Sequence, residues 1–178
     1  ALMLMAEAFP RSEFVGIDIS TEAIQAATVS ARQQGFENLI FLNFDAASLP
    51  ATGDLTRSFD YITAFDAIHD QSRPLGALKG IYAILKPGGL FSMIDIAASS
   101  HLLDNRKHPM GTFLYTVSLM HCMPVGLANG GTGLGMMWGR QKAVAMLEAV
   151  GFEQVQVLEV PADPFNLHFF CRRPSSDQ

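Results

Sequence analysis

Cysteines and clustered basic residues are both scarce in this 178-residue chain, and each shortage excludes a class of protein. The two cysteines, Cys122 and Cys171, are far apart, so they form neither a disulfide framework nor a metal-binding pair. This usage is typical of a reducing compartment, and we expect a cytoplasmic location. Lys and Arg are scattered, and the adjacent pair Arg172 and Arg173 is expected to face solvent. With a net charge of −5, direct contact with nucleic acid is not expected.

Long apolar runs are also missing. No uninterrupted apolar run reaches the roughly 18 residues that a membrane-spanning helix needs, so no membrane partner is expected. Apolar residues nevertheless make up 49% of the chain and charged residues only 16%, which excludes a disordered protein. The length is typical of one domain, assigned here to residues 1–178, and it is sufficient for a buried core.

Short apolar runs alternate along the chain with stretches of helical spacing. The pattern predicts strands at 13–18, 38–45, 59–65 and 90–95, and helices at 1–9, 21–34 and 74–85. Such alternation is typical of βαβ units with a parallel sheet and right-handed crossovers. Near the end, a helix at 141–149 precedes strands at 154–160 and 167–172, whose short connection makes them an antiparallel hairpin. The expected fold class is therefore α/β.

An aspartate lies at or just after the end of each of the first four strands. These residues are Asp18, Asp45, Asp66 and Asp95. Because ligands of parallel α/β sheets bind at the carboxyl ends of the strands, the four acids indicate a site for a nucleoside cofactor.

Residues 97–139 interrupt this alternation and are rich in Met, His and Gly. A helix is expected at 114–123 and a flexible glycine-rich part at 129–135. We interpret this segment as an inserted cover for the site, with an apolar, adaptable lining suited to a small apolar molecule. Its histidines, His101, His108 and His121, have no cysteine or carboxylate at ligand spacing, so no metal site is expected.

Several motifs together resemble the class I S-adenosylmethionine-dependent methyltransferases. They are FVGIDIS at 14–20, FD at 44–45, FDYI at 59–62, AIHD at 67–70, the turn LKPGG at 85–89, and the pair GF at 151–152. The resemblance implies a Rossmann-like, mostly parallel sheet with helices on both faces and the antiparallel hairpin at its C-terminal end. The segment FDAIHDQ at 65–71 is similar to a subgroup that carries a winged-helix domain ahead of the methyltransferase domain.

One feature of that family does not occur in the sequence. Members begin with a strand that ends in an acidic residue and a Gly-x-Gly-x-Gly loop, and nothing of this kind precedes Asp18. The chain is therefore expected to be a fragment that lacks the first, central strand. That strand would lie between the strands ending at Asp18 and Phe65, so its absence should leave two unpaired inner strand edges.

The resemblance also implies roles for single residues in holding S-adenosylmethionine. Asp18 would accept hydrogen bonds from the two ribose hydroxyls, and it could instead cap the helix that follows. Ile19 would pack on the adenine, or belong to the core. Asp45 would accept from the adenine amino group and the Ala46 N–H would donate to a ring nitrogen, whereas Asp45 alone could form an Asx turn.

Four further residues surround the third strand end, where cofactor and acceptor meet in this family. Phe65 is expected at the cofactor, with core packing as its alternative, and Asp66 either contacts the cofactor or caps a helix. His69 is the candidate general base, oriented by Asp70, although a lone histidine also serves as a structural hydrogen-bonding residue.

Three functions follow from these observations. The first is methyl transfer from S-adenosylmethionine to a small, apolar acceptor. The second is a non-catalytic binding or regulatory module of the same fold, and the third is an NAD-dependent oxidoreductase, because an acid at the second strand end also suits that cofactor. Asp45 and the LKPGG turn favour methyl transfer over the oxidoreductase.

Overall fold

The computed structural model describes residues 1–51 and 55–176, and its strands form two sheets. The smaller sheet pairs β1 (Phe14–Asp18) with β2 (Leu39–Asn43) in parallel. The larger sheet has the order β3-β4-β6-β5, in which β3 and β4 are parallel and β6 is antiparallel to both of its neighbours. Its strands are β3 (Phe59–Phe65), β4 (Leu85–Ile96), β5 (Glu153–Glu159) and β6 (Asn166–Arg172).

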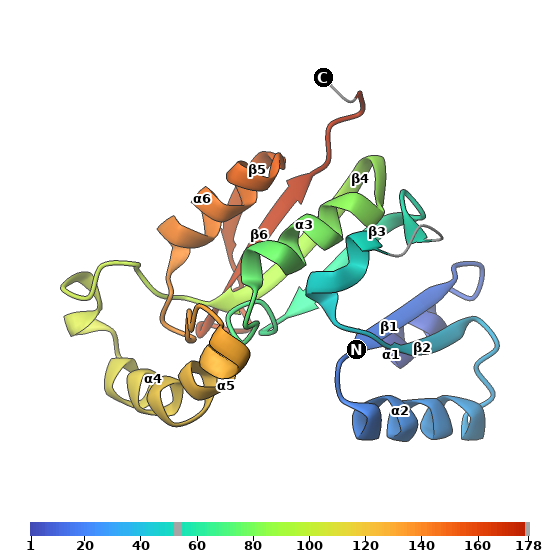
Figure 1. Ribbon diagram of the computed structural model, residues 1–178, viewed down its shortest axis with the longest axis horizontal. Helices are drawn as coiled ribbons and strands as arrows, with labels where there is room; N and C mark the ends of the chain where they lie inside the picture. The colour runs from blue at the N-terminus through green and yellow to red at the C-terminus, as the bar shows by residue number, and fades with distance from the viewer. Residues whose placement is uncertain (52–54, 177–178) are drawn as a thin grey trace.

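This arrangement confirms the α/β fold class and the C-terminal antiparallel hairpin. Within the described residues, β1 pairs only with β2 and β3 pairs only with β4. These are the two strands that were expected to have an unpaired edge, and Figure 1 shows the β1–β2 unit set apart from the larger sheet. Every strand except β6 runs in the same direction within its sheet, as a mostly parallel Rossmann-like sheet requires.

Helices α1 (Leu2–Ala8) and α2 (Thr21–Gln33) cover the small sheet. They share one apolar cluster with the two strands, centred on Ala6, Ala31 and Leu39. Helix α2 begins at a Ser20 N-cap, whose Oγ accepts a hydrogen bond from the Ala23 N–H (3.1 Å), so the capping role falls to Ser20. The β1–β2 unit is therefore a βαβ unit with its own apolar contacts.

The main core lies between the larger sheet and helices α3 (Pro74–Ile84) and α6 (Arg140–Val150). Leu78 from α3 and Leu147 from α6 pack on Phe91 of β4 and Phe169 of β6, and all four are fully buried. The LKPGG turn is not a separate connection, because β4 already begins at Leu85. The register shifts between Phe59, paired with Leu85, and Tyr61, paired with Leu90, so residues 86–89 form a bulge inside the strand.

Residues 97–139 fold mainly as helices. They comprise η3 (Asp104–Lys107), α4 (Gly111–Val117), the π-helical turn η4 (Ser118–Cys122), α5 (Met123–Leu127) and η5 (Ala128–Gly130). The expected helix at 114–123 is thus part of a longer helical stretch. That stretch packs on the rest of the protein through one buried stripe, formed by Leu114, Ser118, Cys122 and Gly126.

The stretch Gly111–Gly130 bears on the expected absence of a membrane-spanning helix. It contains 20 residues, and an 18-residue window within it has a mean hydropathy of 1.2, so by length and composition it could cross a membrane, although polar residues interrupt its apolar runs. Only 28% of that window is buried. Core helices of soluble proteins meet the same criteria of length and composition. The buried stripe shows that one side of this stretch is a packing surface.

Arg173 is not solvated as expected but buried, whereas Arg172 is exposed. Its guanidinium donates to the carbonyl oxygens of Tyr82 and Leu85 (2.8 Å each) at the C-terminal end of α3, and it lies 4.6 Å from the centre of the Tyr82 ring. Helix ends leave such carbonyls without partners inside the helix. Arg173 therefore joins the end of β6 to the end of α3.

We expect Arg173→Leu to lower the free energy of unfolding by at least about 1.5–3 kcal/mol, the range for one hydrogen bond to a charged group. The leucine would leave the α3 carbonyls without their donor. Arg172→Leu, which changes the same charge on the next residue, should stay within about 0.5 kcal/mol of the parent protein. Urea unfolding followed by circular dichroism measures both, and equal effects of the two variants would contradict a structural role for Arg173.

Candidate functional site

The carboxyl end of β1 presents Asp18 and Ile19 to solvent. The Asn43 side chain donates to the backbone oxygens of Asp18 (3.1 Å) and Ile19 (2.8 Å), which fixes this strand end. Asp18 Oδ1 accepts the Ser20 N–H at 2.7 Å, so the residue supports the start of α2 with one oxygen. The Ile19 side chain is 73% exposed, which removes the core alternative for this residue. Both residues are accessible to a ligand, and their contact with a cofactor stays a prediction.

Asp45 follows β2 and is strongly tied to its surroundings. Its Oδ1 accepts the Ala47 N–H (2.9 Å), which is the Asx turn that we considered as the alternative, while Oδ2 accepts from Ser48 (3.1 Å) and Arg73 (2.6 Å). Partial burial alone would raise the pKa of Asp45, but these hydrogen bonds and the Arg73 charge hold it below its usual value. Ala46 begins the turn η1 (Ala46–Ala51). Three of the roughly four acceptor positions of the carboxylate are thus occupied.

Phe65 and Asp66 lie at the end of β3. The Phe65 side chain is 51% exposed, so it does not belong to the core. Asp66 has a positive φ of 47°, an uncommon conformation for a residue other than glycine, and its N–H donates to Ile94 O (2.9 Å). It does not cap α3, whose N-cap is Arg73. Burial and the nearby Asp95 charge raise the pKa of Asp66.

His69 is 2% exposed and is held by Asp95 at the end of β4. Its Nδ1 lies 2.7 Å from Asp95 Oδ1, which also accepts the Trp138 indole N–H (3.0 Å) and the Ile96 N–H (2.9 Å). Burial alone lowers the pKa of His69, but the hydrogen bond and charge of Asp95, with the charges of Asp70 and Asp66, raise it above its ordinary value. Asp95 therefore fixes the ring, and Nε2 points away from Asp95.

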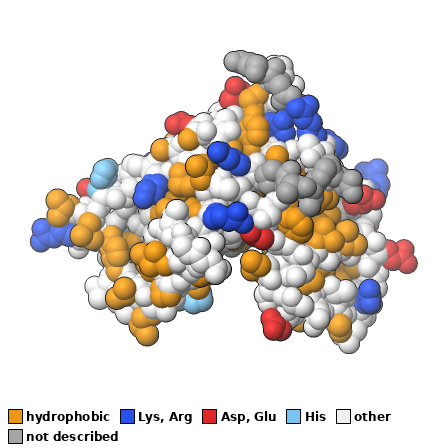
Figure 2. Space-filling model, viewed as in Figure 1, with side chains coloured by type: hydrophobic (Ala, Val, Ile, Leu, Met, Phe, Trp, Pro, Cys, Tyr) orange, Lys and Arg blue, Asp and Glu red, His pale blue; other side chains and the backbone are white. Residues whose placement is uncertain are grey.

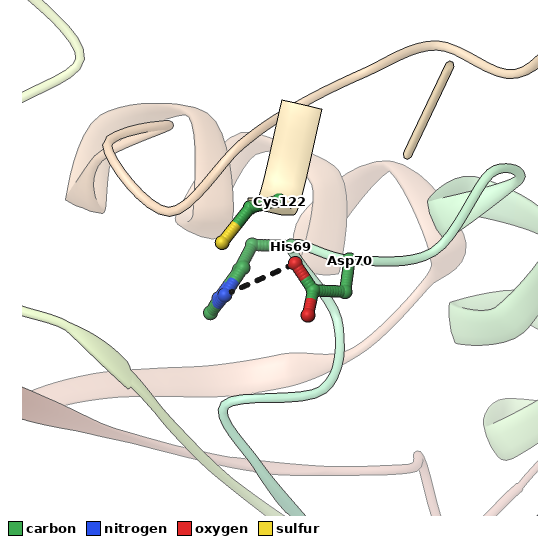
Figure 3. A group of neighbouring side chains, drawn as sticks. All are labelled: His69, Asp70 and Cys122. Carbon is green, nitrogen blue, oxygen red and sulfur yellow. Dashed lines mark ion pairs between the residues drawn. The ribbon is translucent and has the colours of Figure 1, made fainter. Parts of the chain in front are cut away.

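The other side of His69 contains a group of residues that the sequence did not reveal. Nε2 lies 3.4 Å from Asp70 Oδ1. The side chain of the buried Cys122, in η4, directs its sulfur toward the His69 ring (Figure 3). His121 Nε2 lies 3.8 Å from Asp70 Oδ2, so this histidine does have a carboxylate neighbour. Asp70 thus contacts His69, but on the side opposite to Asp95, which is the residue that holds the ring. Cys122 reaches His69 through the way in which residues 97–139 fold, and no residue spacing in the sequence predicts that contact.

The site as a whole combines acids at parallel strand ends with a histidine held by a buried carboxylate. Space-filling surfaces show the molecule hollowed between the β1–β2 unit and the part with α4 and α5 (Figure 2). An α/β sheet with acids at its parallel strand ends is typical of a domain that binds a nucleoside cofactor. A family model described as a methyltransferase domain matches residues 1–130, and the chain belongs to this family.

Three known proteins illustrate the relationship. The chain is 35% identical over 83 residues to the uncharacterized methyltransferase YcgJ of Bacillus subtilis, a match that covers 47% of this chain and 32% of YcgJ. It is 25% identical over 95 residues to the demethylmenaquinone methyltransferase of Listeria welshimeri, covering 53% of this chain and 39% of that protein. A solved S-adenosylmethionine-dependent methyltransferase from Aquifex aeolicus has the same fold, with a TM-score of 0.66 at 16% identity over 96% of this chain and 74% of that one. The matches with the two curated relatives span about a third of their length.

Proposed function

We propose that the protein transfers the methyl group of S-adenosylmethionine to a small, apolar acceptor. The main support is the match of residues 1–130 to a methyltransferase domain. In addition, acids lie at the ends of the parallel strands, where a nucleoside would bind. A structural neighbour across 96% of the chain is named as dependent on S-adenosylmethionine, which supports the same donor here. The non-catalytic module and the NAD-dependent oxidoreductase remain the two alternatives that an experiment must separate.

The β1 end would hold the nucleoside half of the donor. Asp18 fits the ribose because its described hydrogen bonds use Oδ1 only, so Oδ2 is available to hydroxyl donors. Ile19 offers an exposed apolar surface to the adenine. Asp45 would keep its Asx turn and accept from the adenine amino group with its remaining lone pair, while Ala46 supplies an N–H. Phe65 and Asp66, at the end of β3, would face the donor from the larger sheet.

The acceptor would lie under residues 97–139. An apolar cluster of this segment, with Leu114 and Met137 at its centre, packs directly on Ile96 at the end of β4. If the donor binds at the strand ends, this apolar cluster would lie beside the place of transfer. Some of the relatives are named demethylmenaquinone methyltransferases, and an acceptor of that kind would suit such an apolar cluster. A small apolar acceptor therefore suits the segment better than a charged one.

The donor, when bound, supplies a methyl group that its positively charged sulfur already activates. The protein then needs to align the acceptor and exclude water. An acceptor hydroxyl or carbon must also lose a proton as the new bond to the methyl carbon forms. His69 Nε2 is the candidate to take that proton, since Nδ1 is engaged with Asp95.

Titration calorimetry with S-adenosylmethionine and with NAD tests this proposal. We expect heat of binding with S-adenosylmethionine and none with NAD. Binding of NAD alone would favour the oxidoreductase. No heat with either compound, from protein whose circular dichroism spectrum shows that it is folded, would favour the non-catalytic module and reject methyl transfer by this chain.

A further inference from the structure

Three groups with lone pairs converge in the interior beside β3. His69 and Asp70 come from the connection between β3 and α3, and Cys122 comes from η4, far along the sequence. One potential ligand atom from each residue lies within 4.8 Å of the others. Figure 3 shows the sulfur and the carboxylate on either side of the imidazole ring.

The Cys122 thiol is a weak donor that hydrogen-bonds to Asp70, but the other groups that meet here are acceptors. Asp95 takes the Nδ1–H of His69, so a neutral ring directs the lone pair of Nε2 toward Asp70 Oδ1 at 3.4 Å. That carboxylate oxygen is buried and receives no hydrogen bond from the described residues. Lone pairs that face one another in a buried place repel, so a positive charge between them is needed. A proton on Nε2 or a bound cation could supply it.

We propose that His69, Asp70 and Cys122 form a binding site for a zinc ion. Imidazole, carboxylate and thiolate are all zinc ligands, and three protein ligands with one open position make a common coordination set. His121, 3.8 Å from the other oxygen of Asp70, is placed to supply a fourth ligand. The thiolate favours zinc over magnesium or calcium, which prefer oxygen ligands.

The surroundings of His69 are those of a metal-binding histidine. Such a residue almost always donates its second ring N–H to a carboxylate or carbonyl, which fixes the tautomer and orients the ring. Asp95 does this for His69, and Trp138 in turn donates to the same Asp95 oxygen (3.0 Å). Cys122 lies in a π-helical turn, a departure from α-helix that is frequent at functional sites.

The thiol must lose its proton when the ion binds. Burial, followed by the neighbouring Asp70 carboxylate, raises the pKa of Cys122 to about 11. Zinc would therefore displace a proton from Cys122. The free energy of the Zn–S bond must exceed the cost of this deprotonation.

Zinc at this site would engage the nitrogen that we propose as the proton acceptor. Bound zinc would then inhibit methyl transfer, so the site would regulate the activity. The inference that zinc binds does not rest on the proposed function, because neither the donor nor the acceptor takes part in it.

The first test measures Zn²⁺ binding to chelator-treated protein by calorimetry, with Co²⁺ as a spectroscopic probe. We expect one equivalent of Zn²⁺ and, with Co²⁺, the near-ultraviolet absorption of a cobalt–thiolate bond. Cys122→Ser should remove this absorption and weaken Zn²⁺ binding by at least about 100-fold, the upper range for changes even outside the ligand set. Cys171→Ser is the matched control, since Cys171 is equally buried but lies on β6. Absence of Zn²⁺ binding, or the same affinity and Co²⁺ spectrum in Cys122→Ser, would overturn the proposal.

A second variant keeps the test decisive if the serine variant does not fold. Asp70→Asn leaves both the thiol and the imidazole in place and removes one ligand charge. It should keep the cobalt–thiolate absorption while weakening Zn²⁺ binding by about 10-fold or more. Unchanged Zn²⁺ affinity in folded Asp70→Asn would reject the three-residue site. Neither measurement uses S-adenosylmethionine, so a negative result here is distinct from failure of the proposed methyl transfer.

Discussion

His69→Asn is expected to lower the rate of methyl transfer by about 10²–10⁴-fold, the usual contribution of a positioned proton acceptor. Asparagine retains an N–H that can donate to Asp95, so the variant removes Nε2 while keeping the buried hydrogen bond. The affinity for S-adenosylmethionine should not change, because the groups proposed to hold the donor are elsewhere. Formation of S-adenosylhomocysteine, with reduced demethylmenaquinone as the acceptor probe and a chelator present, measures the rate.

His101→Asn is the control for this variant, since His101 is an exposed histidine of residues 97–139. A residual rate within about threefold of the parent protein in His69→Asn would show that His69 has a structural role only.

The pH profile provides a second readout of the same prediction. Only neutral His69 can accept a proton, and its pKa is raised, so the rate should increase with pH and level off above that raised pKa. Asp95→Asn removes the charge that contributes most to raising it. The midpoint of the profile should then move to lower pH, which a merely structural role of Asp95 would not produce.

Local pattern was sufficient to predict most elements of the fold. Strands such as β1 and β3 are short apolar runs with an acid at or just after their end, and the capped start of α2 is encoded within a few residues around Ser20. The antiparallel pairing of β5 with β6 also followed from the short connection between these two strands. The bulge at residues 86–89 was interpreted as a turn, because Pro and Gly indicate a break in regular structure but not whether pairing continues after it.

Contacts between distant segments were the part that local pattern could not predict. Arg173 looked like a surface residue because its partners, the carbonyls at the end of α3, are backbone atoms without any sequence signature. Cys122 looked isolated for a similar reason, since the helical turn that carries it meets His69 only in the folded chain. Asp18 and Asp45 could be identified as site candidates because strand ends converge in this fold class by topology alone.

Asp18→Ala is expected to abolish detectable binding of S-adenosylmethionine. A hydrogen bond to a charged group contributes about 1.5–3 kcal/mol, so loss of even one ribose contact weakens binding by about 10–100-fold, and two contacts weaken it further. Asp18→Asn separates the two roles of the residue. Its amide oxygen can still accept the Ser20 N–H that supports α2, so stability should be retained, while the affinity for the donor falls by a smaller factor than in the alanine variant.

Asp60→Asn is the matched control, because it also removes one aspartate charge. Asp60 lies near the N-terminal end of β3, whereas the proposed site lies at the carboxyl ends of the strands. The Asp60 side chain is largely exposed and pairs with Lys86 (2.8 Å), a surface contact worth about 0–1 kcal/mol. Calorimetry should therefore give the parent affinity for Asp60→Asn and no measurable heat for Asp18→Ala. If the two variants bound the donor equally well, the ribose assignment of Asp18 would fail, and Asp18 would be left with its observed role of holding the Ser20 N–H at the start of α2.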